Sequence, residues 1–242
     1  MKVIQGRGAE TAKITVVCCL HGDEIFGLKV FKFFAKHIAS YPRLKLILAN
    51  EPAIKAKKRF IDQDLNRSFP GSRTGNKEVR LARELMKVIG KTEYLLDIHT
   101  TTSDIKMTPI TASLTKRVQN IINLCASREV AYIKKPLAEK SLIGQYAGSA
   151  SLEFNERYAK KDIALKEIRR VVDNLLHNKK VKMKKRSVFH IDGAISKNIP
   201  LPKRVANFKL IPELGVYPFL LYEKSYKDIH AFSAKRKKTM AV

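Results

Sequence analysis

Three residues of metal-binding type lie where two predicted strands end. His21 and Glu24, in the motif HGDE, follow an apolar run at residues 13–19, and His99 follows a second apolar run at 94–98. Because the carboxyl ends of parallel strands meet at one edge of an open α/β sheet, we expect these side chains to lie together. Two histidines and one glutamate form a ligand set of catalytic zinc sites, which leave a further position open for water. The spacing therefore predicts one Zn²⁺ per chain, held by His21, Glu24 and His99.

Other polar residues are placed to support a hydrolytic centre. Asp97 lies two residues before His99, on the same face of the strand, and is expected to orient that ligand. A long polar loop carries Arg59 and Arg67, and arginine suits both a carboxylate and a developing oxyanion. Glu153 stands in a short apolar run, where an unpartnered carboxylate would cost several kcal/mol. We therefore expect Glu153 to face a polar site.

The motifs, in their order and spacing, resemble the aspartoacylase and succinylglutamate desuccinylase family, a branch of the zinc-carboxypeptidase-like metallohydrolases. The resemblance rests on HGDE, on RFIDQDLNRSFPG, on LLDIHTTTSD and on the strand that carries Glu153, and it spans roughly residues 13–155. It is looser around Tyr226, in SYKDIHAF.

The resemblance implies a catalytic role for two of the matched positions. Arg59 would polarise the carbonyl of the bond that is cleaved. Glu153 would act as the general base that takes a proton from the attacking water, and Glu156 is the alternative base. The resemblance also implies that His21, Glu24 and His99 are the zinc ligands, as the spacing predicts.

The resemblance further implies how a substrate would be bound. Asn66 and Arg67 would hold its α-carboxylate, Asp64 would orient the arginines, and Tyr226 would reach the substrate from the C-terminal part. One position departs from the family. Ile143 stands in the neighbourhood where members that cleave acylated acidic amino acids usually carry a further arginine. The sequence therefore predicts a neutral or apolar amino acid in the substrate.

The pattern of elements predicts an α/β fold. Runs typical of buried strands occupy residues 13–19, 44–49, 94–98, 130–133 and 149–154. Apolar residues at helical spacing occupy residues 25–39, 76–89, 114–125 and 161–176. Strands that alternate with helices are typical of a mostly parallel or mixed sheet flanked by helices.

The pattern changes after a basic run at residues 177–186. Short strand-like pieces follow at 188–191, 205–211 and 217–222. We therefore predict a zinc-hydrolase α/β domain over residues 1–178 and a small β-rich C-terminal subdomain over residues 187–242.

The composition excludes several classes of protein. No apolar run approaches the roughly 18 residues of a membrane span, and neither a signal peptide nor a CxxC pair is recognisable, which predicts a cytoplasmic protein without a membrane partner. The chain contains 48 Lys and Arg against 22 Asp and Glu, a net charge of +26. The lysines are spread along the whole length, which favours a generally basic surface with at most nonspecific contact to nucleic acid.

These observations predict a zinc-dependent deacylase that cleaves the amide bond of a small N-acyl amino acid with metal-activated water. Two alternatives remain at this point. One is a metallocarboxypeptidase acting on peptide C-termini, which an open cleft would favour. The other is a basic, nucleic-acid-associated protein on a hydrolase scaffold, whose nucleic-acid affinity would fall steeply with salt.

Overall fold

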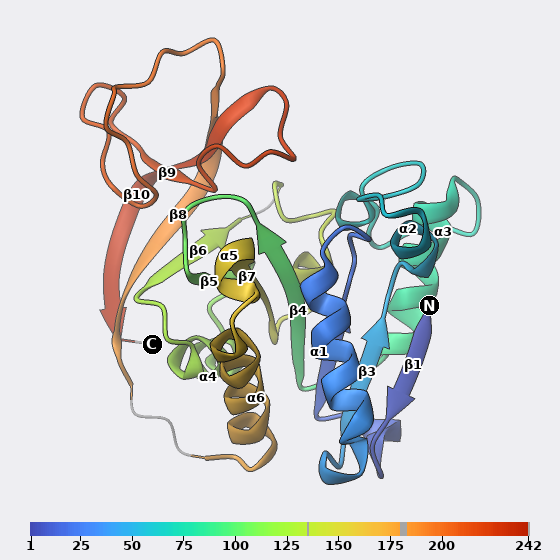
Figure 1. Cartoon of the computed structure of the whole chain (residues 1–242). Coiled ribbons are helices and arrows are strands. Elements are labelled where there is room, and N and C mark those ends of the chain that lie inside the picture. Colours follow the sequence, from blue (N-terminus) through green and yellow to red (C-terminus); the bar gives the residue numbers. More distant parts are fainter. Residues whose placement is uncertain (135, 180–182, 242) are drawn as a thin grey trace.

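The computed structural model describes all residues except 135, 180–182 and 242 (Figure 1). The strands, in chain order, are β1 (Lys2–Gln5), β2 (Ile14–Cys18), β3 (Leu44–Leu48), β4 (Tyr94–Thr101), β5 (Met107–Thr111), β6 (Glu129–Ile133), β7 (Ser149–Asn155), β8 (Lys185–Ser196), β9 (Tyr217–Phe219) and β10 (Ile229–Ala241). The α-helices are α1 (Ile25–Lys36), α2 (Glu51–Ala56), α3 (Lys77–Ile89), α4 (Lys116–Leu124), α5 (Glu156–Ala159) and α6 (Asp162–Leu176). Short 3₁₀ helices are η1 (Ala9–Thr11), η2 (Ile38–Ser40), η3 (Leu65–Arg67) and η4 (Leu142–Gly144).

All of these strands belong to one sheet, in the order β1-β3-β2-β4-β7-β5-β6-β8-β10-β9. The strands β3, β2, β4 and β7 run parallel to one another, as do β5, β6 and β8. The β1/β3, β5/β7, β8/β10 and β9/β10 pairs are antiparallel. The sheet is therefore mixed, which confirms the predicted α/β class.

The central strands are buried on both faces because their side chains alternate between two helical layers. Val16 of β2 packs into the core formed with α1, α4 and α6, whereas its neighbour Val17 packs into the core formed with α3. All five residues of β2 and all five of β3 are buried. In Figure 1, α1 and α6 lie in front of the sheet. The parallel strands thereby bring their carboxyl ends to one edge of the sheet.

The C-terminal part differs from its sequence prediction in detail. The piece predicted at 188–191 belongs to a longer strand, β8, and β10 pairs with it antiparallel over most of its length. Residues 205–211 were expected to be a strand but form loops, with one isolated bridge between Ile211 and Val216. The strand β10 was missed because it contains the lysine-rich run at 235–238, which offers no apolar alternation there. Part of the basic run at 177–186 lies outside the described residues.

The continuity of the sheet bears on the domain division but does not decide it. Strand β8 pairs with β6 in parallel and so extends the sheet of the N-terminal part. The division into residues 1–178 and 187–242 stays a prediction.

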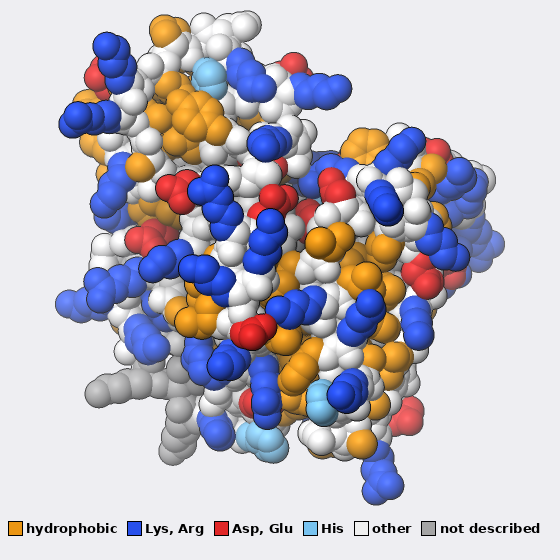
Figure 2. All heavy atoms as spheres, viewed as in Figure 1, with side chains coloured by type: hydrophobic (Ala, Val, Ile, Leu, Met, Phe, Trp, Pro, Cys, Tyr) orange, Lys and Arg blue, Asp and Glu red, His pale blue; other side chains and the backbone are white. Residues whose placement is uncertain are grey.

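No helix in the described part of the chain is long and apolar enough to cross a membrane. Lys and Arg side chains are scattered over the whole face seen in Figure 2.

Candidate metal centre

The turn between β2 and α1 positions two of the predicted ligands. His21 follows the end of β2, and Glu24 immediately precedes the first residue of α1. Gly22, between the two predicted ligands in the sequence, lets the HGDE turn approach helix α2 closely. A Cβ at this position would collide with the backbone of Ala53. The HGDE turn is therefore pressed against the start of α2, and both ligand side chains point to the edge of the sheet.

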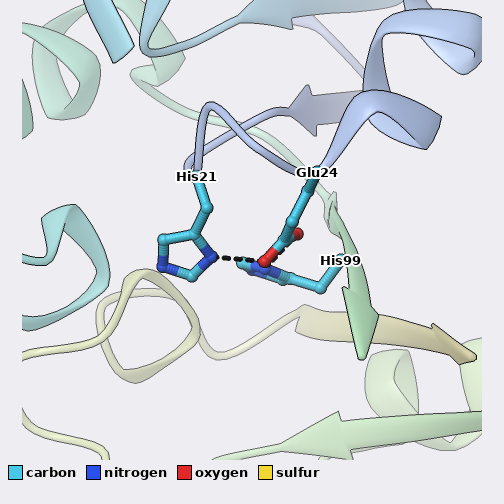
Figure 3. A group of neighbouring side chains, drawn as sticks. All are labelled: His21, Glu24 and His99. Atoms are coloured by element: carbon cyan, nitrogen blue, oxygen red, sulfur yellow. Dashed lines mark hydrogen bonds and ion pairs between the residues drawn. The ribbon is translucent and has the colours of Figure 1, made fainter. Parts of the chain in front are cut away.

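The third predicted ligand, His99, reaches the same point from β4 (Figure 3). The His21 Nδ1 atom lies 2.6 Å from Glu24 Oε1, and the His99 Nδ1 atom lies 3.1 Å from Glu24 Oε2. Ligand atoms of the three residues all lie within 4.8 Å of one another, and all three side chains are buried. The structure thus brings together the three residues that the sequence places at two strand ends.

A carboxylate holds the far nitrogen of each histidine. His21 Nε2 lies 3.0 Å from Asp64 Oδ1, and His99 Nε2 lies 2.7 Å from Asp97 Oδ2. A ring that donates its Nε2–H to its carboxylate leaves Nδ1 as the atom that faces Glu24. An Nδ1 atom and a carboxylate oxygen this close share a proton or a cation. The arrangement of donors therefore fits a divalent cation of the zinc type at the three side chains.

The charges within the cluster shift several pKa values. Burial lowers the pKa of His21 and His99, but Glu24 and the carboxylates behind the rings more than offset it, so both pKa values are raised. Burial would raise the pKa of Glu24 and Asp64, yet the neighbouring histidines hold both values well below the ordinary range. The cluster therefore keeps its carboxylates ionised and attracts positive charge.

Glu153 lies beside this cluster on β7. In the β4/β7 register it stands directly opposite His99, and its side chain lines the same cavity as the three ligands. Burial, assisted by Glu24 and Glu223, raises the pKa of Glu153 to about 8, although the two histidines counteract it. A carboxylate with this pKa is suited to exchanging protons near neutral pH. The alternative base, Glu156, is exposed at the start of α5.

Arg59 links the polar loop to the group formed by His21, Glu24 and His99. Its Nη1 lies 3.4 Å from Glu24 Oε1, and its Nη2 lies 3.3 Å from Asp64 Oδ2. Nη1 also donates to the Ser225 hydroxyl at 3.3 Å. Asp64 therefore contacts Arg59, one of the two arginines that it is predicted to orient. It also bridges to His21, a contact that the sequence analysis did not foresee.

The predicted substrate-binding residues line the same cavity. Asn66 and Arg67 lie in η3, where Arg67 Nη1 donates to the Asn66 carbonyl at 3.0 Å. The Asn66 side-chain oxygen accepts from the backbone N–H of Leu142 at 2.9 Å, so this oxygen is already engaged. Tyr226 is half-buried, and its ring packs edge-to-face on Phe232 at 5.0 Å.

Two buried glutamates that the sequence analysis did not single out hold the site together. Glu78 of α3 accepts from three consecutive backbone N–H groups of the polar loop, Ile61 (2.8 Å), Asp62 (3.0 Å) and Gln63 (3.4 Å). Glu223 binds the end of β4 instead. Neither glutamate gives a local signal in the sequence, because each binds backbone N–H groups of a distant segment, residues 61–63 for Glu78 and Thr102 for Glu223.

Glu223 fixes the C-terminal segment next to the ligand cluster. One of its oxygens accepts from the Thr101 hydroxyl and from the Thr102 backbone N–H (2.8 Å) and hydroxyl (3.1 Å). The other accepts from the backbone and hydroxyl of Ser225, at 3.1 and 2.9 Å. Two residues beyond His99, the strand is thus tied to the loop that carries Ser225 and Tyr226.

The fold and the cluster define a mixed-sheet α/β protein with a buried His-Glu-His group that fits a divalent cation. The sequence model of a protein family, the succinylglutamate desuccinylase/aspartoacylase catalytic domain, matches residues 10–190. The chain belongs to this family. Membership confirms the family that the sequence motifs indicate.

Individual relatives agree with this assignment. An N-acyl-aromatic-L-amino acid amidohydrolase (carboxylate-forming) of Xenopus tropicalis is 30% identical over 112 residues, which cover 40% of this chain and 36% of that protein. The match thus spans little more than a third of the length of this relative. The crystal structure of murine aminoacylase 3 aligns over 96% of both chains, with a TM-score of 0.71 and 17% identity. Succinylglutamate desuccinylase from Chromobacterium violaceum aligns over 98% of this chain and 86% of that chain, with a TM-score of 0.73 and 18% identity. These structures share the fold.

Proposed function

We propose that the protein is a zinc-dependent hydrolase that cleaves the amide bond of an N-acyl amino acid into a carboxylate and a free amine. The observation that carries the proposal is the buried His21-Glu24-His99 group with Glu153 and Arg59 in one cavity. The family and the activity in the name of the Xenopus relative support it.

The metal would be held by His21, Glu24 and His99, with Asp64 and Asp97 fixing the two imidazole rings. When bound there, zinc supplies Lewis acidity and lowers the pKa of water from about 15.7 towards roughly 7.

The remaining residues bind, orient and move protons. Glu153 accepts the proton of the attacking water and later delivers it to the leaving nitrogen, a role worth typically about 10²–10⁴ in rate. Arg59 points its guanidinium at the cluster and stabilises the negative charge that develops on the carbonyl oxygen. Arg67 holds the α-carboxylate of the substrate.

A carboxypeptidase activity is less well supported by the cavity. Residues of the C-terminal part, among them Phe219, Leu220 and Phe232, line the same cavity as the metal-binding group. A site bounded in this way suits a small substrate better than a peptide chain that must extend out of an open cleft.

Amine release from N-acyl amino acids tests the proposed function. The full chain, loaded with zinc, is incubated with a panel of N-acyl amino acids and with short peptides, and free amine is quantified. We expect turnover of N-acyl amino acids by the wild-type protein and at least about a hundredfold less by Glu153→Gln. Turnover of peptides alone would support the carboxypeptidase instead, and no turnover of either would reject both.

A further inference from the structure

Apolar side chains that form one cluster line part of the cavity. This apolar wall consists of the buried or half-buried side chains of Ile110, Ile133, Ile143, Phe219, Leu220 and Phe232. They belong to one hydrophobic cluster, although they come from β5, β6, η4, β9, the residue after β9, and β10. Ile143 is 4% exposed and Phe219 is fully buried. Ile133 and Phe232 are half-buried and keep apolar surface that a ligand would remove from water. The other four side chains are already almost fully buried and support these two from behind.

Two arginines line the cavity, Arg59 and Arg67, and they differ in their partners. Arg59 is paired with both Glu24 and Asp64. Arg67 donates to the Asn66 carbonyl, and no ion pair with a carboxylate of the described residues engages it. Among the described lining residues outside the metal-binding group, Arg67 is thus the cation left for a substrate carboxylate.

A carboxylate of the cavity opposes a second negative charge on the substrate. Glu223 lines the cavity and is 8% exposed, and it is retained in the Glu153→Gln variant. Hydrogen bonds from Thr101, Thr102 and Ser225 hold the pKa of Glu223 below its ordinary value despite its burial, so its charge persists. A like charge placed close to such a buried carboxylate is disfavoured.

We propose that the substrates are N-acyl amino acids with one carboxylate and an otherwise apolar body. The α-carboxylate binds Arg67, and the apolar group lies against the wall that Ile143, Phe219 and Phe232 help to form. This group is either the amino-acid side chain or the acyl chain, because both reach away from the reacting amide. That these ligands are cleaved rests on the proposed hydrolase function. The preference for apolar ligands can be measured by binding alone, without turnover.

Binding to the zinc-loaded Glu153→Gln variant, followed by calorimetry, separates recognition from catalysis. The probes are N-acetyl-leucine (apolar side chain), N-octanoylglycine (apolar acyl chain), N-acetylglycine, N-acetylaspartate and N-succinylglycine. We expect at least one apolar probe to bind about tenfold or more tightly than N-acetylglycine, which is the effect of a few methylene groups in an apolar pocket. The acidic probes should bind more weakly than the apolar ones.

A matched pair of variants connects this preference to the wall. Ile143→Leu keeps the apolar character and should retain the preference, whereas Ile143→Arg should reverse it at least about tenfold towards N-acetylaspartate or N-succinylglycine. If Ile143→Arg does not fold, the half-buried Phe232 provides a second pair of variants. Phe232→Leu should retain the apolar preference, and Phe232→Lys should shift it towards the acidic probes.

The outcomes distinguish this inference from the proposed function. Apolar preference in binding, with no turnover by the wild-type protein, supports the ligand class and rejects the hydrolase. Turnover with a preference for the acidic substrates supports the hydrolase and overturns the ligand class. Failure of every probe to bind overturns the ligand class as well.

Discussion

At the residue scale, the site consists of a chain of carboxylates and imidazole rings that alternate. Asp97, His99, Glu24, His21 and Asp64 follow one another through contacts of 2.6–3.1 Å. The two outer carboxylates fix the rings, and the central carboxylate faces both of them. Because each member is oriented by its neighbours, the three ligand atoms are held close together without large rearrangement.

Removal of one histidine should abolish zinc binding. In His21→Ala or His99→Ala, two ligands remain, and the buried Glu24 loses one of its partners. We expect close to one zinc per chain in the wild-type protein, as measured by elemental analysis, and almost none in either variant. His37→Ala, at an exposed histidine, is the control and should keep its zinc. Full zinc content in both ligand variants would contradict the assignment.

The general base should be identifiable by a variant of the same shape. In Glu153→Gln the amide cannot accept the proton of the water, so kcat should fall at least about a hundredfold. Zinc content should remain near one per chain, because Glu153 is not among the three ligands. Glu156→Gln is the comparison, and an equal loss there would move the base to that residue.

The raised pKa of Glu153 predicts a pH dependence of stability in the metal-free protein. Its pKa of about 8 in the folded state exceeds the ordinary value of 4.5, chiefly because of burial. The folded state therefore favours the protonated form. The corresponding stability is present in full below pH 4.5 and is lost as the pH rises through about 8.

Urea unfolding of the metal-free wild-type protein and of Glu153→Gln at several pH values measures this effect. Between the ordinary pKa and the folded-state pKa, the free energy of unfolding of the wild type should fall relative to the variant, by about 1 kcal/mol or more. Parallel pH profiles would show that the Glu153 carboxyl is not the group responsible.

At the scale of elements, helix α3 organises the loop that carries Arg59, Asp64, Asn66 and Arg67. The connection is Glu78, which is 1% exposed and receives three successive backbone N–H groups of that loop. A loop whose regular structure is limited to the short 3₁₀ helix η3 would otherwise fluctuate. Through this one carboxylate, the position of the arginines depends on a helix that itself contributes no predicted site residue.

Loss of Glu78 should therefore impair catalysis without removing zinc. In Glu78→Ala the three part-buried N–H groups lose their acceptor, and each lost hydrogen bond costs about 0.5–1.5 kcal/mol. Misplacement of Arg59 and Arg67 should lower kcat/KM at least about tenfold, because errors of about 1 Å in positioning cost up to about 10². Zinc content should stay unchanged, since all three ligands lie outside the loop.

The control for this variant lies on the same helix. Glu84→Ala removes an exposed glutamate that pairs with Lys87 and should leave kcat/KM and thermal stability nearly unchanged. If Glu78→Ala melts earlier but keeps its kcat/KM, Glu78 stabilises the fold without positioning the arginines.

The elements that the sequence predicts well are those with a strong local pattern. The runs at 13–19, 44–49 and 94–98 are strands because both of their faces are covered, which makes them continuously apolar. Asp97 was found from the period of two in a strand. The strand β10 was missed because an exposed ribbon needs few apolar residues. Glu78 and Glu223 were not predicted because most of their partners are distant in the chain.

At the scale of the whole molecule, the C-terminal part completes the cavity. Glu223 fastens its loop to Thr101 and Thr102, at the end of the strand that holds His99. Ser225 then contacts Arg59, and Phe219 and Phe232 extend the apolar wall. Residues from both ends of the chain thus contribute to one site, and the looser sequence resemblance of the C-terminal part reflects contacts made by few, scattered side chains.

The net charge of +26 also acts on the whole molecule. Figure 2 shows the basic side chains dispersed over the visible face, which favours a general positive field over a dedicated patch. Such a field attracts any small anion, including an N-acyl amino acid with its free α-carboxylate. Because this attraction acts on encounter and binding, it should appear in KM and leave kcat unchanged.

Steady-state kinetics at increasing ionic strength test this role of the charge. Raising the salt from about 0.1 M to about 1 M shortens the screening length from about 10 Å to about 3 Å. We therefore expect kcat/KM for an N-acyl amino acid to fall severalfold while kcat stays constant. An oligonucleotide should bind the same protein weakly, without sequence preference, and should be released over this range because counterions replace nonspecific phosphate contacts. Sequence-selective binding of the oligonucleotide that persists at about 1 M salt would instead identify a nucleic-acid site, and the dispersed lysines would then have a function beyond attracting the substrate.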